Sequence, residues 1–430
     1  MGDGALPPAA DARGLRVRRG RRHAPLGPPE GGPVRLEAPE RRFLGGTLLL
    51  ALGVRLAALV VWERLGLTER LGNDPYPHYA EILLGWLPPS PILTHPPVYT
   101  FWVAGLYALA RAPSPLLVQS VNVLLGTAGV GLFALWARRR LPPTAARVAA
   151  LWLALDPLLV YFSPQLQSEP LFVALLALFF LGVDSAGPDP RRSDALGLGL
   201  LGGVLTLTRS VVTVYPVFLV GSMLWVRRSL RGAAVWLLLF AGWAVPPTLW
   251  GLRNLHVHGQ FIPLATNGGW TMWEGFTTDR DEVARRPYEM REEVARLGLS
   301  DEGDFFRIGR HFSDKLKAFV RENPLAAARI VAGKALLFWR PWVYDPYPVP
   351  VRWAAGVYFS ALFLLAGFGA WSLRGDPGWA PVWALVINLS ALHAVMFTSL
   401  RYRTPLEPFL VCLAAQGLTK LLPGARKPGV

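Results

Sequence analysis

The sequence reads Asn73-Asp74-Pro75-Tyr76-Pro77-His78-Tyr79, and then Thr94-His95-Pro96-Pro97-Val98, soon after its first long apolar run. Both segments place groups capable of acid–base chemistry beside aromatic rings and rigid prolines. The apolar run, residues 43–62, has a length of about 20 residues that fits the hydrocarbon thickness of a bilayer. The stretch therefore predicts a site at a membrane surface, directly after the first span.

The composition is that of an integral membrane protein. Of 430 residues, 52% are hydrophobic, and long apolar runs recur from residue 43 onward. The formal net charge of +15 does not indicate nucleic-acid binding, because the basic residues lie largely in short loops, where they set membrane orientation. No zinc-finger, basic-zipper or RNA-binding pattern accompanies them. The single cysteine, Cys412, excludes an intrachain disulfide.

The charge rule predicts an all-α polytopic bundle of about 10–12 spans with both termini in the cytoplasm. If residues 97–110 crossed the membrane, the arginines at 138–140 would fall outside, so this segment is expected to be a surface helix, with Tyr99, Trp102 and Tyr107 at the interface. Residues 146–162 and 233–250 are among the predicted spans.

The predicted organisation has five parts. The chain begins with a disordered basic cytoplasmic tail (1–42) and an N-terminal transmembrane catalytic module (43–252), whose first outer loop is 63–112. An extracytoplasmic helical loop (253–350), C-terminal transmembrane helices (351–422) and a short cytoplasmic tail (423–430) follow. In the long loop, residues 282–297 and 305–321 are expected to be amphipathic helices, the second with Phe305, Phe312, Leu316, Phe319 and Val320 on one face. Residues 325–339 are expected to rest on the membrane.

Two motifs that suggest nucleotide chemistry are better explained otherwise. Gly197-Leu-Gly199-Leu-Leu-Gly202 matches the dinucleotide fingerprint, but it lies inside an apolar span without a preceding strand, so close helix packing is favoured. Asp279-Arg280-Asp281 resembles a metal-binding pair of nucleotide-sugar enzymes, yet acids are expected at a helix start. No nucleotide cofactor is expected.

Acidic residues at the predicted outer edges are candidates for chemistry. Asp74, Asp156 and Glu169 all fall there, where an unpaired ionised group costs about 2.5–3.5 kcal/mol on insertion scales. A structural explanation exists for each of the two main candidates. Glu169 could stabilise a helix N-terminus behind Ser168, and Asp74 could form an Asx-turn before Pro75.

Cationic residues gather at the same predicted edges. Arg209 follows one span, Arg253-Asn254 ends another, and Arg401-Tyr402-Arg403-Thr404-Pro405 joins the last two. Snorkelling explains most arginines at membrane edges, but three such groups would also suit a phosphate clamp. His95, and more weakly His256 and His258, could bind phosphate, a metal or the acceptor.

Taken in order, these motifs resemble the C-type-fold polytopic glycosyltransferases, which include the protein O-mannosyltransferases (glycosyltransferase family 39) and the aminoarabinose transferase of lipid A. The resemblance covers residues 43–422. It rests on Asp74 with Tyr76 and Tyr79, His95-Pro96-Pro97-Val98-Tyr99, Ser168-Glu169, Leu207-Thr208-Arg209, Leu252-Arg253-Asn254, Asn267-Gly268-Gly269 and Arg401-Tyr402-Arg403-Thr404-Pro405. His95 stands where relatives commonly have lysine, and Glu169 stands where the aminoarabinose enzyme has aspartate.

The resemblance implies an inverting transfer of a hexosyl or pentosyl group from a polyprenyl-phosphate donor to a lipid, glycan or protein acceptor on the outer face of the cell membrane. Asp74 would act as general base, and Glu169 would orient the acceptor or help hold a divalent ion. The substrate-binding candidates are Tyr76, His78, Tyr79, His95, Arg209, Arg253, Asn254, Arg401 and Arg403. The metal requirement is left open, with Asp74, His95, Glu169, His256 and His258 as candidate ligands. The competing function is a transporter or flippase for a lipid-linked sugar.

Overall fold

The computed structural model describes residues 36–422, with gaps at 71–73, 92–93, 188–189, 228–232, 278–285, 300–303 and 344–347. Throughout the described part of the chain, the regular structure is helical. Most of the predicted N-terminal tail, the Asp279-Arg280-Asp281 motif and the predicted C-terminal tail lie outside the described residues.

Within the described ranges, seven segments are long and apolar enough to cross a membrane, so the predicted polytopic helical fold is confirmed. They comprise α1 (Ala38–Arg64), α5 (Pro115–Arg140), α6 (Pro143–Leu155) with α7 (Pro157–Phe162), α8 (Glu169–Ala186), α11 (Ala233–His258), α16 (Val349–Ser372), and η2 (Pro377–Trp379) with α17 (Ala380–Val395). Shorter helices pack among them, namely α9 (Arg192–Thr208), η1 (Ser210–Val212) with α10 (Tyr215–Arg227), and α18 (Glu407–Leu421).

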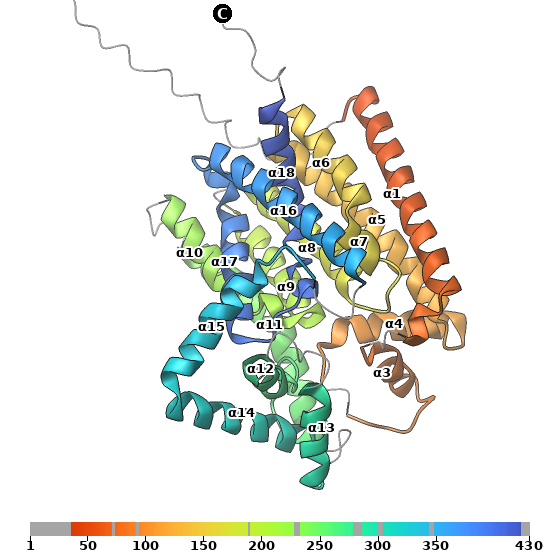
Figure 1. The fold of residues 1–430 in the computed structure, drawn as a ribbon, viewed down its shortest axis with the longest axis vertical. Coiled ribbons are helices and arrows are strands. Elements are labelled where there is room, and N and C mark those ends of the chain that lie inside the picture. The colour runs from red at the N-terminus through yellow and green to blue at the C-terminus, as the bar shows by residue number, and fades with distance from the viewer. Residues whose placement is uncertain are drawn as a thin grey trace, which may run out of the picture.

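The remaining helices gather at one end of the bundle. They are α2 (Leu67–Arg70), α3 (Tyr76–Leu83), α4 (Pro97–Ala110), α12 (Gly268–Thr277), α13 (Arg286–Arg296), α14 (Phe305–Glu322), α15 (Pro324–Phe338) and the short turn η3 (Leu400–Arg403). In Figure 1, α3, α4 and α12–α14 lie at the lower end, whereas α1 begins and α18 ends at the upper end. The predicted first outer loop and long helical loop therefore share one end of the molecule.

The two tyrosines of α4 face the protein rather than a membrane interface, whereas Phe101 is 48% exposed. Tyr99 and Tyr107 are fully buried, and the ring of Tyr99 meets that of Tyr76 from α3 at 4.9 Å. The Tyr99 hydroxyl also accepts a hydrogen bond of 2.7 Å from Asn122 on α5. The interfacial role predicted for these two tyrosines is therefore wrong, because they pack α3 and α5 against α4.

Close helix packing, predicted for the glycine-rich run, is confirmed between α9 and α11. A Cβ on Gly199 would overlap the main-chain oxygen of Leu239, and a Cβ on Gly203 would lie 2.6 Å from the ring of Pro246. The Trp243 indole donates a hydrogen bond of 2.8 Å to the Thr206 hydroxyl across the same contact. Small residues here let the two backbones approach.

The predicted span at residues 146–162 is broken at Asp156. Pro157 begins α7, so the turn leaves main-chain carbonyls of α6 without helical partners. The buried Arg55 of α1 donates to the oxygens of Ala154 at 2.9 Å and Leu153 at 3.3 Å. The Asp156 carboxylate caps α7 through the Leu159 amide at 2.9 Å and accepts a hydrogen bond from Tyr358. The break is thus held by side chains from α1 and α16.

Two other boundaries differ from the prediction. The span predicted to end at residue 250 continues as α11 to His258, and the helix predicted at 282–297 is described only over α13. The amphipathic helix predicted at 305–321 is present as α14, with Ile308, Phe312 and Leu316 buried. Val320, predicted on that face, is 40% exposed, so it lies outside the buried stripe.

Candidate functional site

A cavity lies beside the predicted residues, at the end of the bundle that holds α3, α4 and α12. Its volume is about 370 Å³, and its wall includes Asp74, His95, Arg209 and Arg401. Asn267 and Gly268, at the start of α12, line the same space. With Ser168, which also lines it, the cavity collects residues from six separate segments of the chain.

The two guanidinium groups of this wall join two carboxylates in one network: Asp74, which also lines the cavity, and Glu169, which lies behind the wall. Arg401 binds both acids: its Nη2 lies 2.5 Å from Asp74 Oδ2 and 3.3 Å from Glu169 Oε2, and its Nε donates to Glu169 Oε1. Arg209 Nη1 lies 2.6 Å from Glu169 Oε1 and donates to the Ser168 hydroxyl at 3.3 Å. Asp74 and Glu169, which are 95 positions apart in the sequence, thus share a single cation.

All four charged residues sit where a helix begins or ends. Asp74 precedes α3, Glu169 is the first residue of α8, and Arg209 follows the last residue of α9. Arg401 lies in η3, after α17 has ended at Val395. Prolines at positions 75 and 170 favour the starts of α3 and α8, since proline is compatible with the first helical turn. The charged residues therefore lie at or next to helix ends, close to the cavity, and the apolar middle parts of the helices pack in the bundle.

The two acids have different environments. The side chain of Asp74 is 19% exposed, whereas that of Glu169 is 2% exposed and contacts both arginines. Burial raises the pKa of Asp74, but Arg401 lowers it more, with contributions from His95 and Arg209, so the net pKa lies below the usual carboxyl value. Asp74 is therefore ionised at neutral pH and is the more accessible of the two carboxylates.

His95 reaches the cavity through a short hydrogen-bonded chain. Its Nδ1 lies 3.0 Å from the Thr94 hydroxyl, which also pairs with the Tyr79 hydroxyl. The ring of Tyr76 meets the His95 ring edge-on at 5.3 Å. Burial lowers the pKa of His95 more than Asp74 raises it, so the imidazole is neutral at pH 7. His78 is exposed and does not line the cavity.

The predicted residues on α11 lie outside the cavity wall. Arg253 stacks over the Trp250 ring at 5.0 Å and donates to Asn254 Oδ1 at 2.9 Å. Asn254 is buried and donates to the main-chain oxygen of Ile262 at 2.8 Å. His258 lies 3.2 Å from Arg253, and His256 is exposed. The helix α11 continues past residue 250, so these side chains belong to its last turns, where they contact one another and the following loop.

Arg403 points away from Arg401, into the bundle. Its side chain is fully buried between the rings of Phe359 and Phe363, at 4.4 and 4.7 Å. It donates to the main-chain oxygen of Arg340 at 2.9 Å and lies 3.8 Å from Glu407. Of the two arginines in this motif, only Arg401 lines the cavity.

Several cavity residues were not among the candidates selected from the sequence, and two of them form an aromatic pair. His393 of α17 stacks on Tyr402 at 4.6 Å, and both line the wall. Tyr402 could have been found from its place between two arginines. His393 lies within an apolar run without a motif, so nothing in the sequence distinguishes it.

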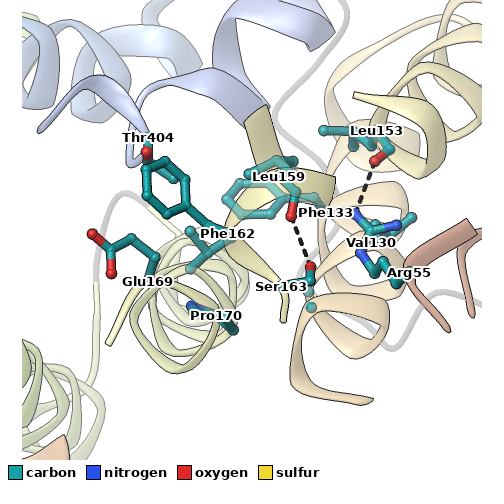
Figure 2. Close-up of a pocket in the computed structure, with 13 residues that line it drawn as sticks. Arg55, Val130, Phe133, Leu153, Leu159, Phe162, Ser163, Glu169, Pro170 and Thr404 are labelled. Atoms are coloured by element: carbon teal, nitrogen blue, oxygen red, sulfur yellow. Dashed lines mark hydrogen bonds between the residues drawn. The ribbon is translucent and has the colours of Figure 1, made fainter. Parts of the chain in front are cut away.

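A smaller cavity of about 20 Å³ lies behind Glu169. Figure 2 shows the Glu169 carboxylate and Thr404 at one end of it and Arg55 at the other, with Ser163 donating to Leu159. Apart from these polar groups the wall is apolar. The volume is about that of one water molecule, so this space is too small for a sugar.

The candidate metal ligands do not form a metal site. Across the described ranges, no three His, Cys, Asp or Glu side chains are placed to hold a metal ion together. Asp74 and Glu169 are joined by the Arg401 guanidinium, which occupies the position a bridging cation would need. His256 and His258 lie outside the cavity wall. The residues therefore do not fit a divalent ion in this arrangement.

Comparisons with known proteins agree with the predicted resemblance. Residues 94–250 match the family model of dolichyl-phosphate-mannose-protein mannosyltransferases. Oligosaccharyltransferase AglB from Archaeoglobus fulgidus, in complex with an inhibitory peptide and a dolichol-phosphate, has a TM-score of 0.52 at 14% identity, covering 89% of this chain and 51% of that chain. Its apo form gives 0.52 at 13% identity, with the same coverage of 89% and 51%.

This likeness confirms the C-type fold that the motifs predicted. The chain spans about half the length of the solved structures it matches, with 51% of each covered. A comparison with curated protein sequences gave no match.

Proposed function

We propose that the chain is an inverting glycosyltransferase that moves a sugar from a polyprenyl-phosphate donor to an acceptor on the outer face of the cell membrane. The observation that carries the proposal is one ion-pair network at the end of the bundle that holds α3, α4 and α12. Asp74, Arg209 and Arg401 of this network line the larger cavity, and Glu169 lies behind them, paired with both arginines. The family model over residues 94–250 supports it, because its name describes sugar transfer from a dolichyl phosphate.

The cavity provides an acid–base group and cations for a single displacement. Asp74 takes the proton of the acceptor hydroxyl as the new bond from that oxygen to the sugar's anomeric carbon forms. The bond from the same carbon to the phosphate oxygen breaks, and its electron pair leaves with polyprenyl phosphate. Asp74 suits this role because it is ionised and more exposed than Glu169.

Arg209 and Arg401 stabilise the negative charge that develops on the leaving phosphate. Both guanidinium groups line the cavity, and a guanidinium carries five N–H donors, more than the carboxylates use here. Their positions are fixed before the substrate arrives by the buried Glu169, so little reorganisation is needed during the reaction. His95 lies beside them as a neutral donor or acceptor.

The orientation follows from the charge rule. The arginines at 138–140 end α5 at the end of the bundle opposite α3 and α4. Both termini are proposed to face the cytoplasm, and the cavity the extracytoplasmic side. A lipid-linked donor would then reach the cavity from within the outer leaflet.

The test uses the full chain reconstituted in liposomes with polyprenyl-phosphate sugars and candidate lipid, glycan and peptide acceptors. We expect the mass of one acceptor to increase by one sugar residue, with inverted anomeric configuration. Movement of the lipid-linked sugar between leaflets without a mass change would instead identify a flippase and overturn the proposal. The proposal would also be overturned if the folded protein neither transferred a sugar nor moved a lipid-linked sugar with any of the donors.

A further inference from the structure

We propose that Arg401 takes the place of a divalent metal ion between Asp74 and Glu169, and that removing its guanidinium creates a divalent-cation site. The catalytic part of this inference rests on the proposed sugar transfer, whereas the cation-binding part does not. Nothing in the family resemblance assigns this role to the arginine.

The geometry places one guanidinium against both carboxylates at once. Arg401 Nη1 and Nη2 face the two oxygens of Asp74 at 3.3 and 2.5 Å, while its Nε and Nη2 face the two oxygens of Glu169. Four carboxylate oxygens are thereby directed at one cation. A pair of carboxylates converging in this way is the arrangement that hard divalent ions prefer when water completes their coordination.

The position of Arg401 is held by its neighbours. Tyr402, the next residue in η3, stacks on the buried His393 of α17 at 4.6 Å, and Arg403 is anchored in the bundle on the other side. A guanidinium stays protonated in proteins, so the cation is permanent. The site therefore holds a cation that neither dissociates nor loses its charge.

Charge balance explains why a metal ion would not join this arrangement. Two carboxylates and the two guanidinium groups of Arg209 and Arg401 sum to zero formal charge. A divalent ion would have to approach two fixed positive charges at short range, where the screening by water is reduced. Without Arg401, the same three remaining groups carry a net charge of −1, and both carboxylates lose a shared partner.

A guanidinium also suits the proposed reaction. A donor with a single phosphate offers few oxygens to a metal ion, but it can accept directed N–H hydrogen bonds from an arginine. Arg401 would thus fix the base, Asp74, and stabilise the leaving phosphate without any metal supply. We expect transfer by the intact chain to be insensitive to chelators.

Cation binding is measured by electron paramagnetic resonance of Mn²⁺ added to the purified full chain. We expect the unaltered protein to leave the free Mn²⁺ signal unchanged and Arg401→Ala to remove one equivalent. The double variant Arg401→Ala/Asp74→Asn should lose this site. Arg374→Ala removes an exposed arginine that stacks on Trp371 and serves as the matched control, with no site gained.

Activity provides the second measurement. Arg401→Ala should lower transfer by about 100-fold or more, as expected for a lost transition-state donor, and Mn²⁺ should restore part of the loss only while Asp74 is present. If Arg401→Ala does not fold, Arg401→Gln keeps the side-chain bulk and takes its place.

An Asp74-dependent Mn²⁺ site in the unaltered protein, or chelator-sensitive transfer, would overturn the inference. Folded position-401 variants that gain no site would overturn it equally. Absence of sugar transfer with every donor would instead count against the proposed function. The Mn²⁺ resonance measurement would still decide whether removal of the Arg401 guanidinium creates a cation site.

Discussion

The two acids of the ion-pair network should differ in their effects on stability and turnover when their charges are removed one at a time. In Glu169→Gln, the Arg209 and Arg401 guanidinium groups lose a partner whose side chain is only 2% exposed. Breaking a buried pair by removing one member costs about 3–5 kcal/mol, because the remaining charge is left uncompensated. In Asp74→Asn, a side chain that is 19% exposed loses its charge, and water can solvate what remains. The cost there should be about 1 kcal/mol.

The assay compares thermal unfolding and sugar transfer on the same reconstituted protein. Glu169→Gln should lower the unfolding midpoint by about three to five times as much as Asp74→Asn, following the free energies above. Asp74→Asn should lower turnover by about 10²–10⁴-fold, the range for a lost general base. Glu169→Asp, which keeps the charge, serves as the control for side-chain length.

Two results would refute this reasoning. Equal midpoint shifts for the two neutral variants would show that burial does not distinguish the acids. Turnover of Asp74→Asn close to that of the unaltered protein would remove Asp74 as the base.

Three further predictions use other parts of the structure. The pKa of Asp74 is lowered, so its carboxylate is already ionised at pH values above the usual carboxyl pKa of about 3.9. Its stabilising contribution is lost only as the pH falls through the lower pKa of the folded state. The pH profile of kcat/KM should therefore show no decline due to Asp74 between about pH 8 and pH 5. Gly199→Leu should separate α9 from α11 and lower the unfolding midpoint, whereas Gly197→Ala, whose added Cβ meets nothing within 4 Å, should not. Arg253→Ala should reduce transfer far less than Arg209→Ala, since only Arg209 lines the cavity, and equal losses in initial rate would contradict this placement.

Hydropathy and charge were sufficient to predict the helical membrane fold and the glycine contact. Apolar runs of membrane length are local properties of the sequence, and closely spaced glycines in such a run have few other uses. The same methods missed the break at Asp156, because an acid followed by proline also occurs at the end of a span. They ended α11 too early, since Arg253 and Asn254 are polar but remain helical.

The shared guanidinium could not be predicted from the sequence. Arg401 and Asp74 are separated by 327 positions, and their contact requires the segment after α17 to lie beside the segment before α3. Arg401 and Arg403 lie in one short turn and differ little as sequence features, yet the 3₁₀ geometry sends them in opposite directions. Which arginine reaches the cavity is decided by tertiary packing.

The buried arginine of α1 has a consequence for how the chain is made. Arg55 finds its carbonyl partners in Ala154 and Leu153, which the ribosome adds about 100 residues later. Until then the nascent first helix carries a charge whose insertion into lipid costs about 2.5–3.5 kcal/mol. Its other residues, with a mean hydropathy of 2.1 over the best window, must hold it in the bilayer meanwhile. We therefore expect the first helix to reach its final packing only after the segment that carries Leu153 and Ala154 has been inserted.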